Sequence, residues 1–167
     1  MIVCVDVDYR ATAVVAACVG FGEWTDAAAA AESVTRTPGA PAEYRSGEFF
    51  RRELPYVLAA LAAFGAAPRA VVIDGYVWLG PERAGLGAHL HEALGGGVAV
   101  VGVAKRPFAG ATSAIAILRG TSRQPLYVTA AGTDVDAAAA SVRSMHGPHR
   151  IPTLLKRVDR LCRDAGA

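Results

Sequence analysis

A short apolar run in the middle of the chain, residues 70–73 (Ala-Val-Val-Ile), is the feature that most constrains the fold. It contains no polar residue, and Asp74-Gly75, a pair typical of a turn, ends it. A strand that is apolar on both sides must be covered on both faces, as parallel strands are in α/β proteins. The run therefore predicts a sheet with helices packed on both of its faces.

The segments that follow predict a β-α-β unit. A helix is expected from about Glu82 to Leu94, and the glycines at 95–97 end it before an apolar strand at 98–103. Two neighbouring strands joined through a helix run parallel. The chain therefore contains at least one parallel pair.

The N-terminal part predicts antiparallel strands. Residues 1–8 alternate, and residues 12–19 form a second apolar run after a turn. Residues 27–37 favour a third strand, although the alanines at 27–31 also favour helix. The remaining expected elements are a helix capped by Ser46 and ended at Phe64 by Gly65, strands at 114–118 and 125–129, and helices at 134–145 and 152–164.

The 167 residues suit one domain, 1–167, of the α/β class. We expect a mixed sheet, antiparallel in its first three strands and parallel afterwards, flanked by helices. The net charge of +2 does not indicate a polyanionic partner, so a nucleic-acid surface would need local clusters such as 51–52, 105–106 and 156–157. Each of these clusters can equally be a solvated surface.

The sequence also limits the compartment and the kind of metal site. Its three cysteines show no Cys-x-x-Cys spacing, which argues against a disulfide framework and a zinc site. It lacks the basic start of a signal peptide and the ~20 unbroken apolar residues of a membrane helix. We expect a cytoplasmic monomer without a membrane partner.

Three acids interrupt otherwise apolar patterns. Asp6 lies in the first strand on the side of Ile2 and Cys4, and Asp74 ends the most apolar strand. Glu53 lies on the apolar stripe of the 46–64 helix and should point at the sheet. The stripe consists of Phe50, Leu54, Val57, Leu58 and Leu61.

A buried carboxylate must be paired, protonated or bound to a cation. Mg²⁺ prefers oxygen ligands and assists phosphodiester hydrolysis, so three converging acids indicate a magnesium site. The alternative is structural: Asp6 and Asp74 end strands as turn residues, and Glu53 pairs with Arg52 or another base.

Several segments resemble the endonuclease V family in their order and spacing. Val-Asp-Val-Asp-Tyr at 5–9 resembles the opening strand of that family, and the 101–105 segment reproduces its Gly-Val-Ala-Lys. The other matching segments are 44–55 (Tyr-Arg-Ser-Gly-Glu-Phe-Phe-Arg-Arg-Glu-Leu-Pro), 71–75, 85–90, Gly110, 118–119, 125–128 and 150–152. The resemblance covers nearly the whole chain, without the N-terminal extension common in the family.

The resemblance implies an RNase H-like fold that holds Mg²⁺, or Mn²⁺ as a substitute. The family's enzymes recognise deaminated bases, hypoxanthine in DNA and in some members inosine in RNA, and cut the second phosphodiester 3′ to the lesion. By position, Asp6 and Asp74 would be metal ligands, Glu53 a ligand or a water-positioning acid, and Asp159 a ligand of a second ion. Lys105 would be a cation beside the scissile phosphate. We prefer Asp6 to Asp8 as the ligand because of its place in the motif.

The resemblance also implies a pocket for the flipped base. Its residues would be Gly47, Phe49, Gly75, Gly85, Leu86 and Phe108, with Tyr44 as the aromatic residue of a strand-separating wedge. His89 would contact nucleic acid or be a structural histidine. It cannot share an ion with His91, because residues two apart on a helix point in different directions.

Some family positions differ here. Val77 to Arg83 replace a segment that carries a histidine, Thr133 stands in place of another histidine, and the segment at 153–156 departs from the family's pattern. Two other functions therefore stay open: a nucleic-acid-binding protein of the same fold that is non-catalytic or altered in specificity, and a hydrolase of another small phosphodiester.

Arg45 and Ser46 replace the apolar residue and the proline of the family's wedge. A weaker wedge unstacks paired bases poorly. We therefore predict that the protein prefers single-stranded, flapped or RNA substrates. The measurement compares cleavage of one inosine oligonucleotide alone and paired with its complement, and equal cutting of the paired form would contradict the prediction.

Overall fold

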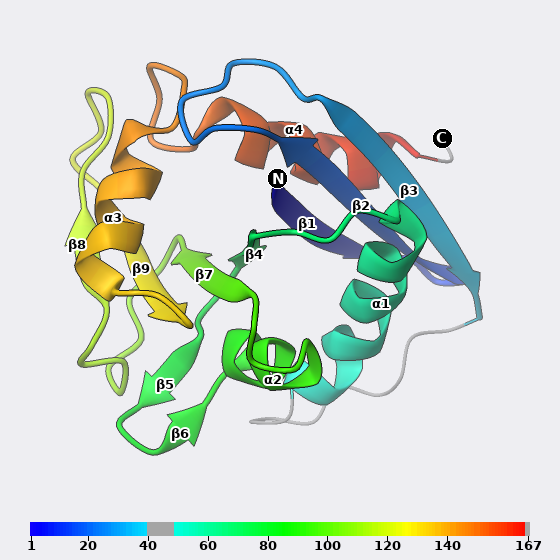
Figure 1. Ribbon diagram of the computed structural model, residues 1–167, viewed down its shortest axis with the longest axis horizontal. Coiled ribbons are helices and arrows are strands. Elements are labelled where there is room, and N and C mark those ends of the chain that lie inside the picture. The colour runs from blue at the N-terminus through cyan, green and yellow to red at the C-terminus, as the bar shows by residue number, and fades with distance from the viewer. Residues whose placement is uncertain (40–48, 166–167) are drawn as a thin grey trace.

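The computed structural model describes residues 1–39 and 49–165. Its elements, in chain order, are β1 (Ile2–Tyr9), β2 (Ala13–Phe21), β3 (Ala31–Pro38), α1 (Phe49–Phe64), β4 (Ala70–Asp74), β5 (Trp78–Gly80), β6 (Arg83–Ala84), α2 (Leu86–Ala93), β7 (Ala99–Ala104), β8 (Ile115–Ile117), β9 (Leu126–Ala131), α3 (Val135–Ser144) and α4 (Thr153–Asp164). Seven of the strands form one sheet in the order β3-β2-β1-β4-β7-β9-β8 (Figure 1).

The sheet is mixed, as the sequence predicts. β1, β2 and β3 pair antiparallel, and β4 pairs in parallel with both β1 and β7. β9 reverses direction, since it is antiparallel to both of its neighbours, β7 and β8. The parallel part of the sheet is therefore confined to β1, β4 and β7, and the prediction of parallel strands after the first three fails for β8 and β9.

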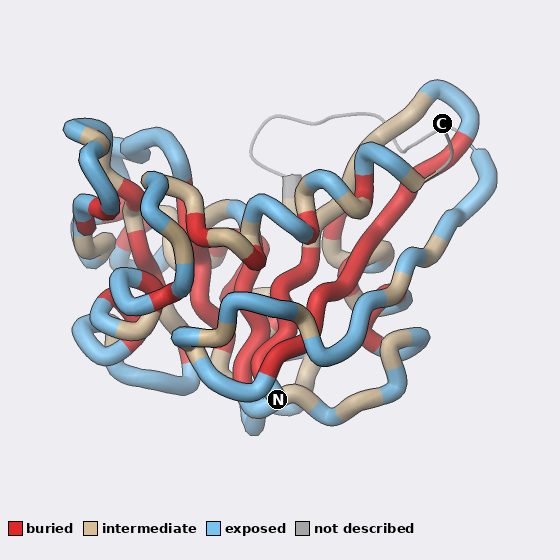
Figure 2. The backbone as a smooth tube through the Cα atoms, turned by 90° about the horizontal axis from the view of Figure 1, so that it is seen from above, coloured by how far each residue is buried: buried red, intermediate tan, exposed pale blue. Residues whose placement is uncertain are grey.

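Helices cover both faces of the sheet. On one face, α1 and α2 pack over the side chains of Val3, Val5, Val71 and Ile73. On the other, α3 and α4 pack over the opposite residues of the same strands, including Ile2, Cys4 and Val72. Figure 2 shows the buried strands as a layer between more exposed segments. The complete burial of the 70–73 strand is thereby explained.

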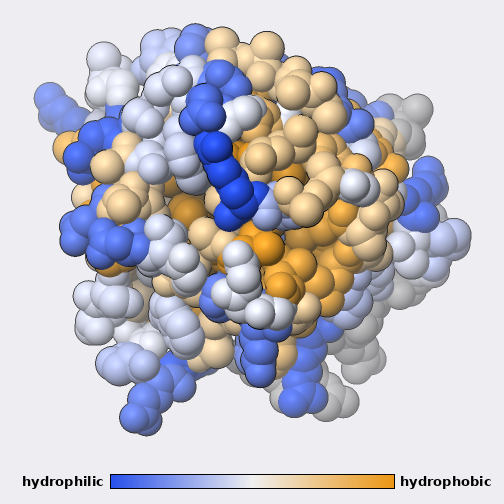
Figure 3. Space-filling view, viewed as in Figure 1, coloured by the Kyte–Doolittle hydropathy of each residue, from blue (hydrophilic) through white to orange (hydrophobic). Residues whose placement is uncertain are grey.

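In the direction of Figure 1, apolar residues gather at the centre and right of the surface, strongly hydrophilic atoms cross its upper centre, and hydrophilic residues prevail at the left and below (Figure 3). Within residues 1–39 and 49–165, no helix combines the length and the apolar character that crossing a bilayer requires.

Two expected boundaries are corrected. The helix expected from Glu82 begins at Leu86, because residues 78–84 form the small two-stranded sheet of β5 and β6. Gly85 makes the tight junction between them: a side chain there would place Cβ 2.5 Å from the Tyr76 carbonyl oxygen. The third strand begins at Ala31, so the alanines before it do not form a helix. Ser46, the expected cap of α1, lies outside the described residues.

A buried arginine holds the loop between α3 and α4. Arg119 is only 5% exposed, and its guanidinium donates hydrogen bonds to the backbone carbonyls of five residues: Arg143, Met145, Gly147, His149 and Arg150. A guanidinium has five N–H donors in a fixed plane, which suits several carbonyls at once. Arg119 thus fixes the segment that leads into α4.

We predict that Arg119→Met lowers the free energy of unfolding by about 3 kcal/mol, because the buried carbonyl of Met145 and several part-buried carbonyls lose their donor together. Arg123→Met is the matched control, since Arg123 is exposed on the same connection and should change stability by less than about 0.5 kcal/mol. Urea unfolding of both variants measures the difference. Equal stabilities would show that Arg119 does not hold the loop.

Candidate metal and phosphate site

The pairing of two parallel strands brings Asp6 and Asp74 together. β1 and β4 are in register from Ile2 opposite Ala70 to Val5 opposite Ile73. Asp6 and Asp74 are the next residue on each strand, and alternation puts both on the side of Cys4 and Val72, which α4 covers. Two carboxylates therefore lie side by side at the carboxyl edge of the sheet, where sites of α/β proteins are commonly built.

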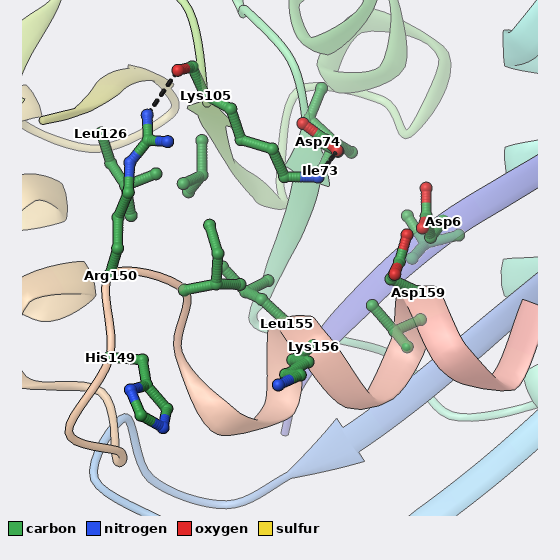
Figure 4. Close-up of a pocket in the computed structure, with 14 residues that line it drawn as sticks. Asp6, Ile73, Asp74, Lys105, Leu126, His149, Arg150, Leu155, Lys156 and Asp159 are labelled. Carbon is green, nitrogen blue, oxygen red and sulfur yellow. Dashed lines mark hydrogen bonds and ion pairs between the residues drawn. The ribbon is translucent and has the colours of Figure 1, made fainter. Parts of the chain in front are cut away.

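Two further predicted residues reach the same place. Lys105 follows β7, and its Nζ lies 2.5 Å from Asp74 Oδ2. Asp159 lies on α4, where Arg163 pairs with it at 2.9 Å. Figure 4 shows Lys105 extending to Asp74, and Asp159 beside Asp6. These four residues line one hollow of about 190 Å³.

Asp8 also lines this hollow, but its carboxylate is engaged by Arg10 at 3.0 Å. Arg10, the partner of Asp8, lies two residues away in the turn after β1. The structure thus places Asp6, rather than Asp8, beside Asp74.

Glu53 approaches from the opposite face of the sheet. It lies on α1 with only 7% of its surface exposed, as the position on the apolar stripe predicts. Its pKa is raised to about 8: burial is the largest cause, the charges of Asp6 and Asp74 act in the same direction, and Arg52 opposes them. Glu53 therefore lies within electrostatic reach of both strand-end acids, although it does not line the hollow.

The pKa of Asp6 responds to the same cluster. Burial raises it to about 6, and the charges of Asp74 and Asp159 act in the same direction, while the Val7 amide and Lys105 oppose them. The acids of the two layers thus repel one another. A positive charge among them would lower both pKa values.

The donor set fits a hard divalent ion. Asp6, Glu53, Asp74 and Asp159 offer carboxylate oxygens, which Mg²⁺ and Mn²⁺ prefer. As the side chains stand, no three acids, histidines or cysteines within residues 1–39 and 49–165 lie close enough together to hold an ion. The ammonium of Lys105 contacts Asp74 instead. Lys105 would therefore compete with an ion for that carboxylate.

The residues expected around a flipped base divide into two groups. Gly75 lies at the site, directly after Asp74, with a φ of 141° that favours glycine. Phe108 is 39% exposed, and its ring lies 6.1 Å from that of Tyr76. In contrast, Gly85 and Leu86 are buried, and the His89 ring stacks on Phe50 at 3.8 Å. Tyr44, Gly47 and the side chain of Phe49 lie outside the described residues.

Two residues near the site had no role in the sequence-based hypothesis. Tyr76 donates a hydrogen bond of 2.7 Å from its hydroxyl to the Arg106 carbonyl, which ties the β4 turn to the segment after β7. Arg150 lines a larger cavity of about 330 Å³ that adjoins the acids. Tyr76 could have been found by its place after Asp74-Gly75. Arg150 lay within a matching segment, but its contacts are distant in sequence.

Comparison with known proteins yields one family. The sequence model described as Endonuclease V matches residues 1–151. Endonuclease V of Streptomyces avermitilis is 34% identical over 142 residues, which are 73% of this chain and 61% of that protein. Endonuclease V of Streptomyces coelicolor is 32% identical over 142 residues, 73% of this chain and 60% of that protein. The chain therefore spans about three-fifths of the length of these curated relatives.

Solved structures agree. The crystal structure of the Streptomyces avermitilis enzyme has a TM-score of 0.76 at 31% identity and covers 98% of this chain and 80% of that one. Endonuclease V of Ciona intestinalis, in complex with a 23mer DNA containing an inosine followed by a ribo-adenosine, has a TM-score of 0.84 at 18% identity, covering 98% and 84%. The second likeness concerns the fold alone. Together they confirm the predicted RNase H-like fold.

We predict that Glu53 makes the stability of the metal-free protein depend on pH. Its pKa is 4.5 ordinarily and about 8 in the fold, so the folded state keeps a proton that the unfolded chain releases between these values. Its contribution to stability is complete below pH 4.5 and is lost as pH rises through 8. Relative to Glu53→Gln, which cannot ionise, the parent should lose roughly 3 kcal/mol between pH 5 and 8.

Thermal unfolding of both proteins at each pH measures this loss. Glu92→Gln is the control, because Glu92 is exposed on α2. A constant difference between the parent and Glu53→Gln across this range would show that Glu53 does not feel the acidic cluster.

Proposed function

Because this chain belongs to the endonuclease V family, we propose that it is a metal-dependent endonuclease that hydrolyses a phosphodiester bond in DNA or RNA. One observation carries the proposal: the parallel register of β1 and β4 places Asp6 and Asp74 side by side. The hollow that they share with Asp159 is also lined by two cationic residues, Lys105 and Arg163. An acidic cluster that faces a polyanion is unfavourable for binding alone, which supports turnover over a purely binding role.

We propose a deaminated base, hypoxanthine or inosine, as the feature that selects the substrate, in a DNA-repair type of reaction. The support is the Ciona intestinalis relative, whose DNA contains an inosine. An enzyme that reads one altered base must take it out of the stack, which requires an open backbone position beside the scissile phosphate. Gly75 offers one, since among residues 1–39 and 49–165, its two chain neighbours aside, no atom lies within 4 Å of where a side chain would begin.

Asp6 and Asp74 would hold the principal ion, and Glu53 and Asp159 would complete its surroundings from α1 and α4. When bound, Mg²⁺ or Mn²⁺ would supply positive charge at the phosphate and lower the pKa of a water molecule. Its charge would also lower the pKa of Glu53, so that this carboxyl gives up its proton and can accept a hydrogen bond from water.

Lys105 supplies the cation on the protein's side. Its Nζ lies at the acids, and Asp74, Asp6 and Asp159 all raise the pKa of this ammonium, against the lowering effect of its partial burial. It therefore stays protonated at neutral pH. Released from Asp74, the ammonium can donate to a phosphate oxygen as negative charge develops there.

The test is incubation with Mg²⁺ or Mn²⁺ and a panel of inosine-containing, mismatched, single-stranded and plain oligonucleotides. We predict cutting of inosine-containing strands that stops when the metal is chelated. Asp74→Asn should lower the rate by at least ~100-fold, and Lys105→Ala by about 100-fold. Lys105→Ala should weaken nucleic-acid binding but leave metal binding nearly unchanged.

Two variants serve as controls. Asp136→Asn removes an exposed acid of α3 and should cut like the parent. Asp8→Asn distinguishes between the two candidate ligands of β1, Asp6 and Asp8. If it lowers the cleavage rate as much as Asp6→Asn does, the ligand role would be assigned to Asp8. If Asp74→Asn and Lys105→Ala both cut like the parent, the catalytic assignment is wrong, and a panel without any cut strand would contradict the proposed function.

A further inference from the structure

The cavity of about 330 Å³ beside the acids has no role in the mechanism above. It lies between the carboxyl edge of β1, β4 and β7 and the beginning of α4. Its apolar wall comes from strands and helix together and includes Val103, Leu126, Ile151, Leu155 and Val158. Cavities of roughly 300 Å³ and above are the usual size of sites for small organic groups.

The cavity opens onto the candidate site. Asp6, Asp74, Lys105 and Asp159 line both the cavity and the smaller hollow of the acids. Figure 4 shows the arrangement: Asp6 and Asp159 on one side, Arg150 and Leu126 on the other, and Leu155 between them. A group attached to a phosphate at Lys105 could therefore enter the cavity directly.

This cavity is separate from the expected pocket of the deaminated base. None of the described residues of that pocket, namely Gly75, Gly85, Leu86 and Phe108, lines it. Leu86 packs in the core under α1 and α2, whereas Val103 and Leu126 belong to the core under α3 and α4. Leu86 therefore lies on the other face of the sheet from Val103 and Leu126.

The charges at its wall suit a phosphorylated partner. Lys105, His149, Arg150 and Lys156 all line the cavity. The Arg150 guanidinium donates to the carbonyls of Pro125 and Lys105 and to the Gln124 side chain, which are neutral acceptors. Its Nε is buried without a hydrogen-bond partner among the described residues. The positive charge of Arg150 is thus held at this wall by neutral groups.

We propose that the cavity binds the base of a nucleotide next to the cleaved phosphodiester, so that the enzyme holds a second unstacked base besides the deaminated one. The inference rests on the proposed function. A nucleobase has large apolar faces, which the valine and leucine wall would cover, and its backbone phosphates would meet Lys105, Arg150 and Lys156. A second captured base explains how a chain with a weakened wedge can keep a strand in position.

The experiment uses single-stranded oligonucleotides with one inosine and one abasic nucleotide, which is moved through each neighbouring position. Binding to the full chain is measured in Ca²⁺, which takes the same oxygen ligands as Mg²⁺. We expect a loss of affinity of about tenfold at one position beside the cleaved bond, in addition to the loss at the inosine itself. Equal affinities at all the neighbouring positions would overturn the proposal.

Cavity-filling variants show where that base binds. Leu155→Phe and, as a second variant, Ile151→Phe should weaken binding of the intact oligonucleotide about tenfold. They should have no effect on the oligonucleotide that is abasic at the sensitive position. Leu161→Phe is the matched control, because Leu161 lies on the same helix, is similarly half-buried and does not line the cavity. Thermal unfolding of each variant checks that it is folded.

The outcomes separate this proposal from the proposed function. Cleavage in Mg²⁺ without any sensitive neighbouring position would contradict the second base site and leave the nuclease intact. A sensitive position without cleavage would contradict the nuclease and leave a base-binding cavity. If folded Leu155→Phe and Ile151→Phe bind all oligonucleotides as the parent does, the base lies elsewhere and the proposal is wrong.

Discussion

The repulsion between carboxylates at the carboxyl edge of the sheet is the interaction on which the rest of the structure depends. The parallel register of β1 and β4 makes Asp6 and Asp74 neighbours where the pairing of these strands ends. The fold answers in two ways. Lys105 brings a positive charge from the adjacent strand, and Glu53 keeps its proton because its pKa is raised to about 8. With the Lys105 contact and the protonated Glu53, the cluster of acids can still be stabilised by a stronger positive charge.

The edge of the sheet is also where the two helical layers meet. Glu53 comes from α1 on one face and Asp159 from α4 on the other, while Asp6 and Asp74 come from the strands between them. In the middle of the sheet the strands would keep such residues apart, because side chains alternate between the faces. Where the pairing of β1 with β4 ends, acids from both layers can act on one another. The site therefore requires the complete layered fold, although each acid belongs to a different element.

The sequence predicted what depends on local pattern. The alternation of residues in β1 predicted the face of the sheet on which Asp6 lies. The apolar stripe of the helix predicted that Glu53 is buried, which the structure confirms. The prediction failed where contacts between residues distant in sequence determine the local structure. Residues from Glu82 were expected to begin a helix, yet Arg83–Ala84 pair with Trp78–Gly80, and Gly85 packs against Tyr76 before the helix begins. Nothing near Arg119 in the sequence indicates that it binds carbonyls 24 to 31 residues away.

Arg119 connects the segment between α3 and α4, whose contacts the sequence did not predict, to the candidate site. The segment between α3 and α4 has no regular structure, so its carbonyls need donors from elsewhere. Arg119 supplies them, and the segment that it fixes carries His149, Arg150 and Ile151 into the wall of the cavity. Arg150 in turn donates to the carbonyl of Lys105, the residue that contacts Asp74. Through two arginines bound to backbone carbonyls, the position of a loop and that of Lys105 depend on each other, so disturbing Arg119 should alter the proposed phosphate contact of Lys105 as well as stability.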